Sequence, residues 1–243
     1  MIIISSKSSS QFISRYEGNY HKDIILGIGG GQVAEEAKWV GKHLRKEVIL
    51  VPTNLSCDAF WTKTVAVRIP GKQPVYVDAV RPITVEFDGE ILTICHKRYL
   101  VAGWADILSG ITAMDRMAGN QYTIQMCKLI DKCCYPGTVE EIKVLFDTLE
   151  EEVKLCDLAG SSAVEEGLEH KIAYELEKYN KFDLLHGELV FMGIQLLMQK
   201  GFLMSSSCDK IKYFFNKLEI KPTEWVKLFG KDLCEAIVDE VWR

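Results

Sequence analysis

The feature that most constrains the fold is a run of three glycines between an apolar segment and a segment with helical periodicity. The run lies in "LGIGGGQVAEEAK", residues 26–38. A strand that passes into a helix through glycines exposes backbone N–H groups, and the helix dipole favours an anion there. The spacing differs from the dinucleotide fingerprint G-x-G-x-x-G, because Gln32 occupies the position of the last glycine. Two interpretations stay open: Gly29, Gly30 and Gly31 bind an anion, or they form a tight turn that requires positive φ.

Composition excludes several classes of protein. The chain has 243 residues, of which 48% are hydrophobic and 26% charged, as in globular proteins. A net charge of -5 argues against nucleic-acid binding, which requires a dense basic surface. No apolar run approaches the roughly 20 residues that span a bilayer, and the start lacks the features of a signal peptide. We therefore expect a cytoplasmic protein with no nucleic-acid or membrane partner, whose eight cysteines, with no CxxC pair, are free thiols.

The hydrophobic pattern changes near residue 98. Before it, short β-favouring runs predict strands at 2–5, 24–28, 48–51, 65–68 and 83–87. Nearly continuous apolar runs are typical of a parallel sheet covered on both faces, although Asp88-Gly89 also suits a two-residue hairpin turn. After it, apolar residues recur at helical spacing. We expect an α/β plus all-α fold, with a shortened α/β domain at 1–97, an all-helical domain at 98–243 and a ligand in the cleft between them.

Three residues of the second half form a candidate metal site. Asp106 lies among small and apolar residues in "AGWADILSG", His170 lies within a predicted helix, and His186 opens another helix in "HGE". A buried carboxylate is costly unless it is paired or metal-bound. Two imidazoles and one carboxylate with an open position suit catalytic zinc or non-haem ferrous iron. Each residue also has an ordinary interpretation as a helix cap or a solvated helix residue, so the residues alone leave both interpretations open.

A polar loop follows the third predicted strand. The segment "VPTNLSCDAFWTKTVAVR", residues 51–68, carries Thr53, Asp58 and Lys63. Loops at the carboxyl ends of parallel strands are where ligands bind in such sheets. There, Asp58 could orient a hydroxyl or relay a proton, and Lys63 could meet a phosphate or an oxyanion. The alternative is a polar loop that caps the next helix.

These segments, in this order, resemble the superfamily of iron-containing alcohol dehydrogenases, glycerol dehydrogenases, glycerol-1-phosphate dehydrogenases and dehydroquinate synthases. "GIGGGQVAEEAKWV" is similar to the GGG-x-x-x-D-x-A-K segment of the glycerol-1-phosphate dehydrogenase branch, and "VPTNLSCDAFWT" to its proline-threonine loop. "AGWADILSGITAMD", "AGSSAVEEGLEH" and "HGELVFMG" resemble its metal-binding segments. The resemblance implies cofactor contacts at the glycine run, Glu35 and Thr53, a substrate-side role for Asp58, and one divalent metal, zinc or iron, bound by Asp106, His170 and His186.

The chain also departs from the pattern of this family. Ala163 and Val164 follow the GSS segment where Arg-Pro is usual, and Trp61 and Lys63 replace small or proline residues, which would reshape the substrate pocket. Family members carry more chain before the glycine run, including strands that shape the adenosine side of the nicotinamide site. We therefore expect a sheet with fewer strands and a weaker hold on NAD(P). The start at Met1, directly before a predicted strand, favours a natural short form.

Three functions follow from these observations. The first is a metal-dependent dehydrogenase that oxidises a small polyol phosphate or a related alcohol with NAD(P). The second is a metal-dependent lyase or cyclase on the same scaffold, without net redox chemistry, in which the glycine run holds part of the substrate. The third is a degenerate binding subunit, against which the three retained ligands argue. A shortened sheet leaves an open edge and apolar surface, so we also expect a homo-oligomer.

Overall fold

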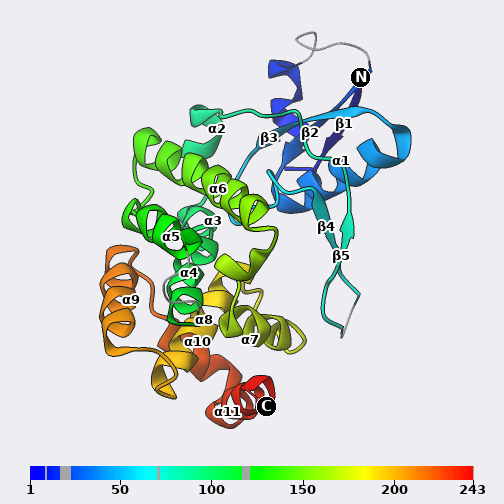
Figure 1. Ribbon diagram of the computed structural model, residues 1–243. Coiled ribbons are helices and arrows are strands. Elements are labelled where there is room, and N and C mark those ends of the chain that lie inside the picture. The colour runs from blue at the N-terminus through cyan, green and yellow to red at the C-terminus, as the bar shows by residue number, and fades with distance from the viewer. Residues whose placement is uncertain (9, 17–22, 70–71, 117–120, 243) are drawn as a thin grey trace.

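The N-terminal part is built on a four-stranded parallel sheet (Figure 1). The structure is a computed structural model that describes the chain except residues 9, 17–22, 70–71, 117–120 and 243. The strands stand in the order β1 (Ile2–Ser5), β2 (Ile24–Gly29), β3 (Glu47–Pro52) and β6 (Thr84–Val85). Gly29 lies beside Pro52, where both strands end. The glycine run and the loop after β3 therefore leave the same edge of the sheet next to each other.

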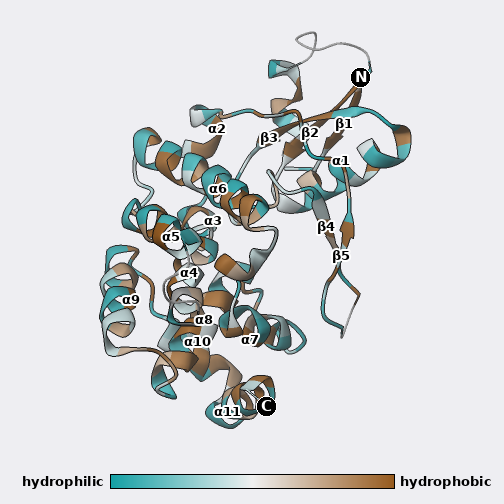
Figure 2. Ribbon diagram, in the orientation of Figure 1, coloured by the Kyte–Doolittle hydropathy of each residue, from teal (hydrophilic) through white to brown (hydrophobic). Residues whose placement is uncertain are grey.

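The two central strands of the sheet, β2 and β3, are buried on both faces, as the apolar runs predict. All six residues of β2 are buried. Ile25 packs in the main core with the buried face of helix α1 (Gly31–Leu44), whereas Leu26 packs in a smaller cluster with the 3-10 helix η1 (Ser10–Arg15). Figure 2 shows these strands mostly in the brown of hydrophobic residues, whereas the helices carry both hydrophobic and hydrophilic residues. Successive side chains of a strand point to opposite faces, so a continuous apolar run is buried on both.

One predicted strand lies outside the parallel sheet. β4 (Thr64–Val67) pairs antiparallel with β5 (Val75–Asp78), so the expectation that residues 65–68 join the parallel sheet is wrong, and β5 was not predicted. The two strands form a hairpin that extends from the sheet past helix α7 (Leu168–Glu177) (Figure 1). The hydroxyl oxygens of Tyr76 on the hairpin and Tyr174 on α7 lie 2.8 Å apart. The hairpin therefore forms a wall of the space between the sheet and the helices.

The alternative prediction of a hairpin turn at Asp88-Gly89 is also wrong. Asp88 instead caps helix α2 (Gly89–Thr93), and its Oδ1 accepts a hydrogen bond from the amide of Ile91 at 3.0 Å. Aspartate followed by glycine is favourable in a hairpin turn, and aspartate is equally favourable at a helix N-terminus. The helix buries both Ile91 and Leu92, the first in the smaller apolar cluster beside the sheet and the second in the main core, which favours the helix.

The described chain after α2 is helical. Its helices are α3 (Lys97–Ala102), α4 (Trp104–Arg116), α5 (Gln121–Asp131), α6 (Val139–Ala159), the 3-10 helix η2 (Ser162–Val164), α7, α8 (His186–Gln199), α9 (Ser205–Lys217), α10 (Pro222–Phe229) and α11 (Lys231–Trp242). Among the described residues, no helix is both long enough and apolar enough to cross a membrane. The division into domains at 1–97 and 98–243 stays a prediction.

A buried lysine ties the loop after β3 to α1. The side chain of Lys38 is fully buried, and its Nζ donates to the carbonyl oxygens of Ala59 (2.6 Å) and Thr64 (2.7 Å) and to the hydroxyl of Thr62 (2.8 Å). Burial lowers the pKa of Lys38 to about 8. These bonds satisfy loop oxygens that would otherwise lack partners, so the loop has a fixed position beside the glycine run.

Replacement of Lys38 by methionine should leave these acceptors unsatisfied. We expect Lys38→Met to lower the free energy of unfolding by about 2–4 kcal/mol, measured by urea denaturation. Lys42, one turn later, is exposed and donates to the carbonyl oxygen of Asp78 at 2.7 Å. Lys42→Met should therefore cost less than about 0.5 kcal/mol. Equal losses in the two variants would contradict the role of Lys38.

Candidate functional site

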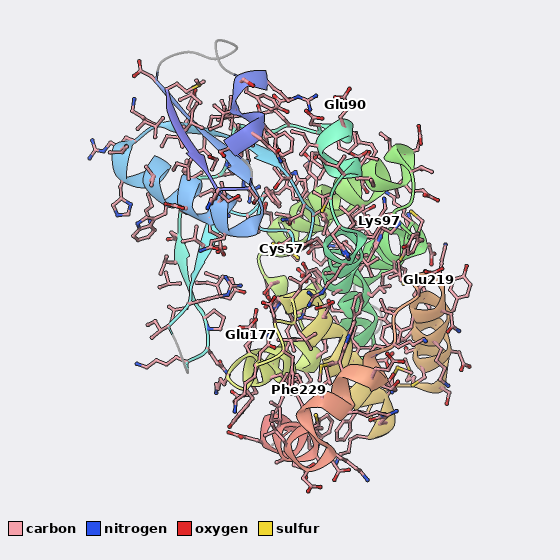
Figure 3. The ribbon with its side chains drawn as sticks, turned by 180° about the vertical axis from the view of Figure 1, so that it is seen from behind. Cys57, Glu90, Lys97, Glu177, Glu219 and Phe229 are labelled. Carbon is pink, nitrogen blue, oxygen red and sulfur yellow. The ribbon has the colours of Figure 1, made fainter. Side chains whose placement is uncertain are left out.

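A cleft of about 590 Å³ lies between the sheet and the helices. Its walls come from the N-terminus of α1, the loop after β3, the β4–β5 hairpin and helices α4, α6, α7 and α8. Figure 3 shows Cys57 of the loop where the sheet meets the helices, and Glu177 of α7 farther along the helical part. Asp106, His170 and His186 all line this cleft.

These three candidate metal ligands converge from three helices. Asp106 lies in the first turn of α4, His170 lies in α7, and His186 is the first residue of α8. Their potential ligand atoms all lie within 4.8 Å of one another, and Nε2 of His170 is 3.7 Å from Oδ1 of Asp106. Asp106 and His170 are only 4% and 2% exposed. The fold thus brings together residues whose separations in sequence form no local motif.

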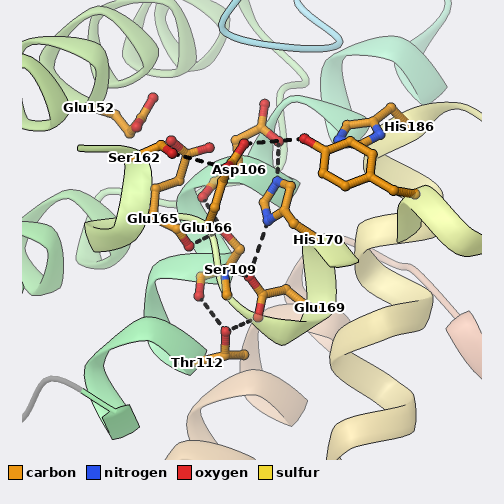
Figure 4. Close-up of polar contacts among 12 residues, drawn as sticks. Asp106, Ser109, Thr112, Glu152, Ser162, Glu165, Glu166, Glu169, His170 and His186 are labelled. Atoms are coloured by element: carbon orange, nitrogen blue, oxygen red, sulfur yellow. Dashed lines mark hydrogen bonds and ion pairs between the residues drawn. The ribbon is translucent and has the colours of Figure 1, made fainter. Parts of the chain in front are cut away.

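Each histidine contacts a second carboxylate. Nδ1 of His170 lies 3.1 Å from Oε1 of Glu169, and Nδ1 of His186 lies 2.7 Å from Oε1 of Glu177. Figure 4 shows the first pair together with Thr112, whose hydroxyl donates to Glu169. A carboxylate that accepts the Nδ1 proton fixes the tautomer and leaves the Nε2 lone pair for a metal ion. Two anchored imidazoles and a buried carboxylate therefore fit a divalent cation, and both zinc and ferrous iron accept this donor set.

Two glycines let the histidine-bearing helices approach their neighbours closely. A Cβ at Gly187 would lie 2.2 Å from the carbonyl oxygen of Ala102, and a Cβ at Gly193 would lie 2.5 Å from that of Glu169. These distances are shorter than non-bonded atoms tolerate, so a side chain at either position would force α8 away from α3 or α7. The glycine of the "HGE" segment thus allows α8 to approach α3 closely.

The glycine run opens the N-terminus of α1 to the cleft. Gly31 begins the helix, no side chain caps it, and Gly31 lines the cleft. A Cβ at Gly30 would lie 2.4 Å from Nδ2 of Asn54, and a Cβ at Gly31 would lie 2.8 Å from Sγ of Cys57. None of Gly29, Gly30 and Gly31 has positive φ, so the interpretation as a turn that requires positive φ is wrong. The glycines admit the neighbouring loop, and the uncapped helix end suits an anion.

Three of the four other predicted site residues line the cleft, and the fourth lies beside the glycine run. Glu35, Asp58 and Lys63 line the cleft with the three candidate ligands. Thr53 instead pairs with the glycine run, since its amide donates to the carbonyl oxygen of Gly29 at 2.9 Å. Burial and neighbouring carboxylates raise the pKa of Asp58 well above its usual range. Asp58 is therefore a carboxyl that holds its proton to a higher pH than an exposed aspartate does.

Several residues of the site were not identified from the sequence. Glu169 directly precedes His170, and adjacent helical residues ordinarily face different directions, so the motif gives no sign of their contact. Glu177 is nine residues before His186 and belongs to another helix. Arg68 and Arg81 line the cleft from beside the β4–β5 hairpin, and the sequence does not predict this hairpin. Only the packing of the helices and the hairpin brings these residues into the site.

The carboxylates around His170 favour its protonated form when no cation is bound. Burial alone would lower the pKa of His170, but hydrogen bonds with Asp106 and Glu169 and the nearby charge of Glu166 raise it to about 10. A metal ion requires the neutral imidazole, so the proton and the metal compete for the same lone pair.

Metal binding should therefore weaken as the pH falls. Because the pKa of His170 is raised to about 10, the imidazole of the metal-free protein carries a proton between about pH 6.5 and 8.5. We expect the apparent dissociation constant for Zn²⁺ to rise about tenfold for each pH unit lowered in this range. Calorimetric titrations across the range measure the slope, and a constant affinity would contradict the competition.

Loss of a second carboxylate should weaken the site without removing a ligand. We expect Glu177→Gln to reduce Zn²⁺ affinity about 10- to 100-fold, because His186 loses the charged acceptor that orients it. Glu175→Gln is the matched control, since Glu175 lies on the same helix but contacts Lys178 and Gln73. Competition with a chromophoric chelator gives both affinities. A similar loss in the control would show that the effect is not specific to Glu177.

The chain is similar to known protein sequences. A sequence model of iron-containing alcohol dehydrogenase matches residues 5–95. The chain is 28% identical over 220 residues to a glycerol-1-phosphate dehydrogenase of Sulfurisphaera tokodaii. That alignment covers 82% of this chain and 60% of the relative, so the chain spans less than two thirds of the relative's length.

Solved structures extend the likeness over nearly the whole chain. A probable glycerol dehydrogenase of Sinorhizobium meliloti 1021 matches with a TM-score of 0.72 and 19% identity, over 99% of this chain and 81% of that one. The 2-epi-5-epi-valiolone synthase of Streptomyces hygroscopicus, solved with NAD⁺ and Zn²⁺ bound, matches with a TM-score of 0.62 and 17% identity, over 97% of this chain and 68% of that one. At these identities the structures show a shared fold. The chain is therefore similar in sequence to iron-containing alcohol dehydrogenases and to a glycerol-1-phosphate dehydrogenase, and it shares its fold with a probable glycerol dehydrogenase and a 2-epi-5-epi-valiolone synthase.

Proposed function

We propose that the chain is a metal-dependent dehydrogenase that oxidises a small polyol phosphate or a related alcohol in the cleft. The observation that carries this proposal is the convergence of Asp106 with two carboxylate-anchored histidines, in a cleft that also contains the open N-terminus of α1. The similarity to a glycerol-1-phosphate dehydrogenase supports this substrate class. The alcohol would lie between the candidate ligands and the loop after β3.

Asp106, His170 and His186 would hold one divalent cation, zinc or iron, which supplies a Lewis acid for the alcohol oxygen. Asp58 lines the same cleft and has a raised pKa. We assign it to orient the substrate hydroxyl and to exchange a proton with it, because a carboxyl with a raised pKa exchanges protons nearer to neutral pH. Lys38 holds the loop that carries Asp58 and so keeps its carboxyl facing the cleft.

The nicotinamide cofactor, as acceptor of hydride, is proposed at the glycine run. The backbone amides at the uncapped start of α1 would bind its pyrophosphate, with Gly29, Gly30 and Gly31 allowing close approach. Glu35 lines the cleft farther along α1, and its carboxylate accepts a hydrogen bond from the amide of Ala66 at 2.9 Å. This contact fixes the hairpin to the helix that would carry the cofactor.

Three cations suit a phosphorylated substrate. Lys63, Arg68 and Arg81 line the cleft. Arg68 contacts Glu35 at 3.3 Å and Arg81 contacts Asp157 at 2.6 Å. Lys63 is exposed and forms no ion pair within the described part of the chain. We therefore assign Lys63 to the substrate phosphate, in keeping with its position on the loop after β3.

The test titrates Zn²⁺-loaded protein with NAD⁺ and NADP⁺ and then follows alcohol oxidation by the absorbance of the reduced nucleotide. We expect binding below about millimolar concentration and faster turnover of glycerol 1-phosphate than of glycerol. Lys63→Ala should raise KM for the phosphorylated substrate about tenfold and change that for glycerol by less than about twofold. Lys42→Met serves as the control for loss of an exposed cation outside the cleft.

The other outcomes distinguish the remaining functions. Zn²⁺ binding without NAD⁺ or NADP⁺ binding at millimolar concentration would contradict the dehydrogenase and favour a metal-dependent lyase or cyclase. Unchanged Zn²⁺ affinity in His186→Ala would contradict the metal site itself and favour a binding subunit.

Two further expectations belong to this proposal. The β4–β5 hairpin exposes Val67 (41%), Val75 (53%) and Tyr76 (51%), and this apolar surface supports a homo-oligomer. The structure forms no disulfide among the eight cysteines, all of which it describes. Free thiols suit a reducing compartment, so we propose a cytoplasmic location.

A further inference from the structure

A second group of potential metal ligands lies beside the first. It consists of Glu152 and Cys156 on α6 and of Glu165, which follows η2. In Figure 4, Glu152 and Glu165 are drawn on one side of Asp106 and His186 on the other. Glu165 lies within the "AGSSAVEEGLEH" segment, but nothing in the sequence brings it together with Glu152 and Cys156.

Local structure explains how the three side chains meet. Glu152 and Cys156 are four residues apart on α6 and so share one face of the helix. The helix ends at Gly160, whose φ of 69° reverses the chain and returns Glu165 toward that face. Ser109 donates to the carbonyl oxygen of Glu165 at 3.0 Å, which fixes the returning segment to α4. The group is therefore held by two helices and a defined turn.

The distances within the group, where the thiol of Cys156 donates to both carboxylates, are close to those between ligands of one cation. Sγ of Cys156 lies 3.0 Å from Oε1 of Glu152 and 3.5 Å from Oε2 of Glu165. The potential ligand atoms of all three residues lie within 4.8 Å of one another. Two ligands of a tetrahedral zinc ion are about 3.3–3.5 Å apart, given metal–ligand bonds of about 2.0–2.3 Å.

One oxygen of the group lacks a partner. Glu152 is 0% exposed, and its Oε2 accepts no hydrogen bond from any residue that the structure describes. Glu165 is 6% exposed, so two carboxylates are removed from water within reach of one thiol. Burial raises the pKa of Glu152 and of Glu165. Without a cation, this group must retain protons, and the unpaired oxygen carries a desolvation cost of about 1–3 kcal/mol.

We propose that Glu152, Cys156 and Glu165 form a second divalent-cation site, for which zinc is the best match because it accepts carboxylate and thiolate ligands together. Cys156 and Glu165 line the cleft, so water can complete the coordination. The proposal goes beyond the proposed dehydrogenase, because it needs neither NAD(P) nor an alcohol, and it shares no ligand with Asp106, His170 and His186.

Co²⁺ is the probe that separates the two sites. A thiolate bound to Co²⁺ gives an intense charge-transfer band in the near ultraviolet, whereas imidazole and carboxylate ligands do not. We expect the full chain to bind two equivalents of Co²⁺ and to show this band. Cys156→Ser should lose the band and bind one equivalent of Co²⁺. Glu152→Gln should keep both equivalents but lower the affinity for the Co²⁺ ion that produces the band at least about tenfold.

Two further variants keep the assignment specific. Cys57→Ser removes another cysteine that lines the cleft and should retain the band. His186→Ala should also retain the band while losing the other equivalent, so failure of the proposed active site is distinguished from failure of this one. Circular dichroism confirms that each variant is folded. A single equivalent without the band in the unmodified chain, or a band that survives in Cys156→Ser, would overturn the proposal.

Discussion

Buried negative charge is the constraint on which the rest of this structure depends. Asp106, Glu152, Glu165 and Glu169 are each no more than 6% exposed and lie around His170 and the cleft. Hydrogen bonds within the protein stabilise part of this charge, since Glu169 accepts them from Thr112 and from the amide of Gly167. Carboxylates removed from water are stable only when protons or cations neutralise them. The two candidate metal sites are the places where several such carboxylates lie close together, and where a bound cation would neutralise them.

Close backbone approach makes this concentration possible. The absence of side chains at Gly187 and Gly193 lets α8 lie against α3 and α7, which sets the distance between His170 and His186. At the opposite side of the cleft, Gly30 and Gly31 admit the loop after β3, and Lys38 holds that loop in place. Glycines at close contacts therefore shape both ends of the cleft, the one proposed to bind an anion and the one proposed to bind a metal ion.

Much of the fold was predictable because its signals are local. The apolar runs predicted all four strands of the parallel sheet, and helical spacing predicted α1 and the helical second half. The errors occurred where a local signal suits two structures. Asp88 favours a hairpin turn as well as a helix cap, and β4 has the composition of a sheet strand but finds its partner in β5.

The sequence by itself determined the residue types of the candidate site, the strand–glycine–helix unit and the order of the segments that resemble the family, because these reside in neighbouring residues. Tertiary structure alone decided that Glu177 contacts His186, that the hairpin closes the cleft, and that Glu152, Cys156 and Glu165 meet. It also decided that the glycine run lets the loop after β3 come close to the backbone, and that none of its three glycines has a positive φ. These properties depend on the distances between packed elements, and periodicity along a chain carries no information about those distances.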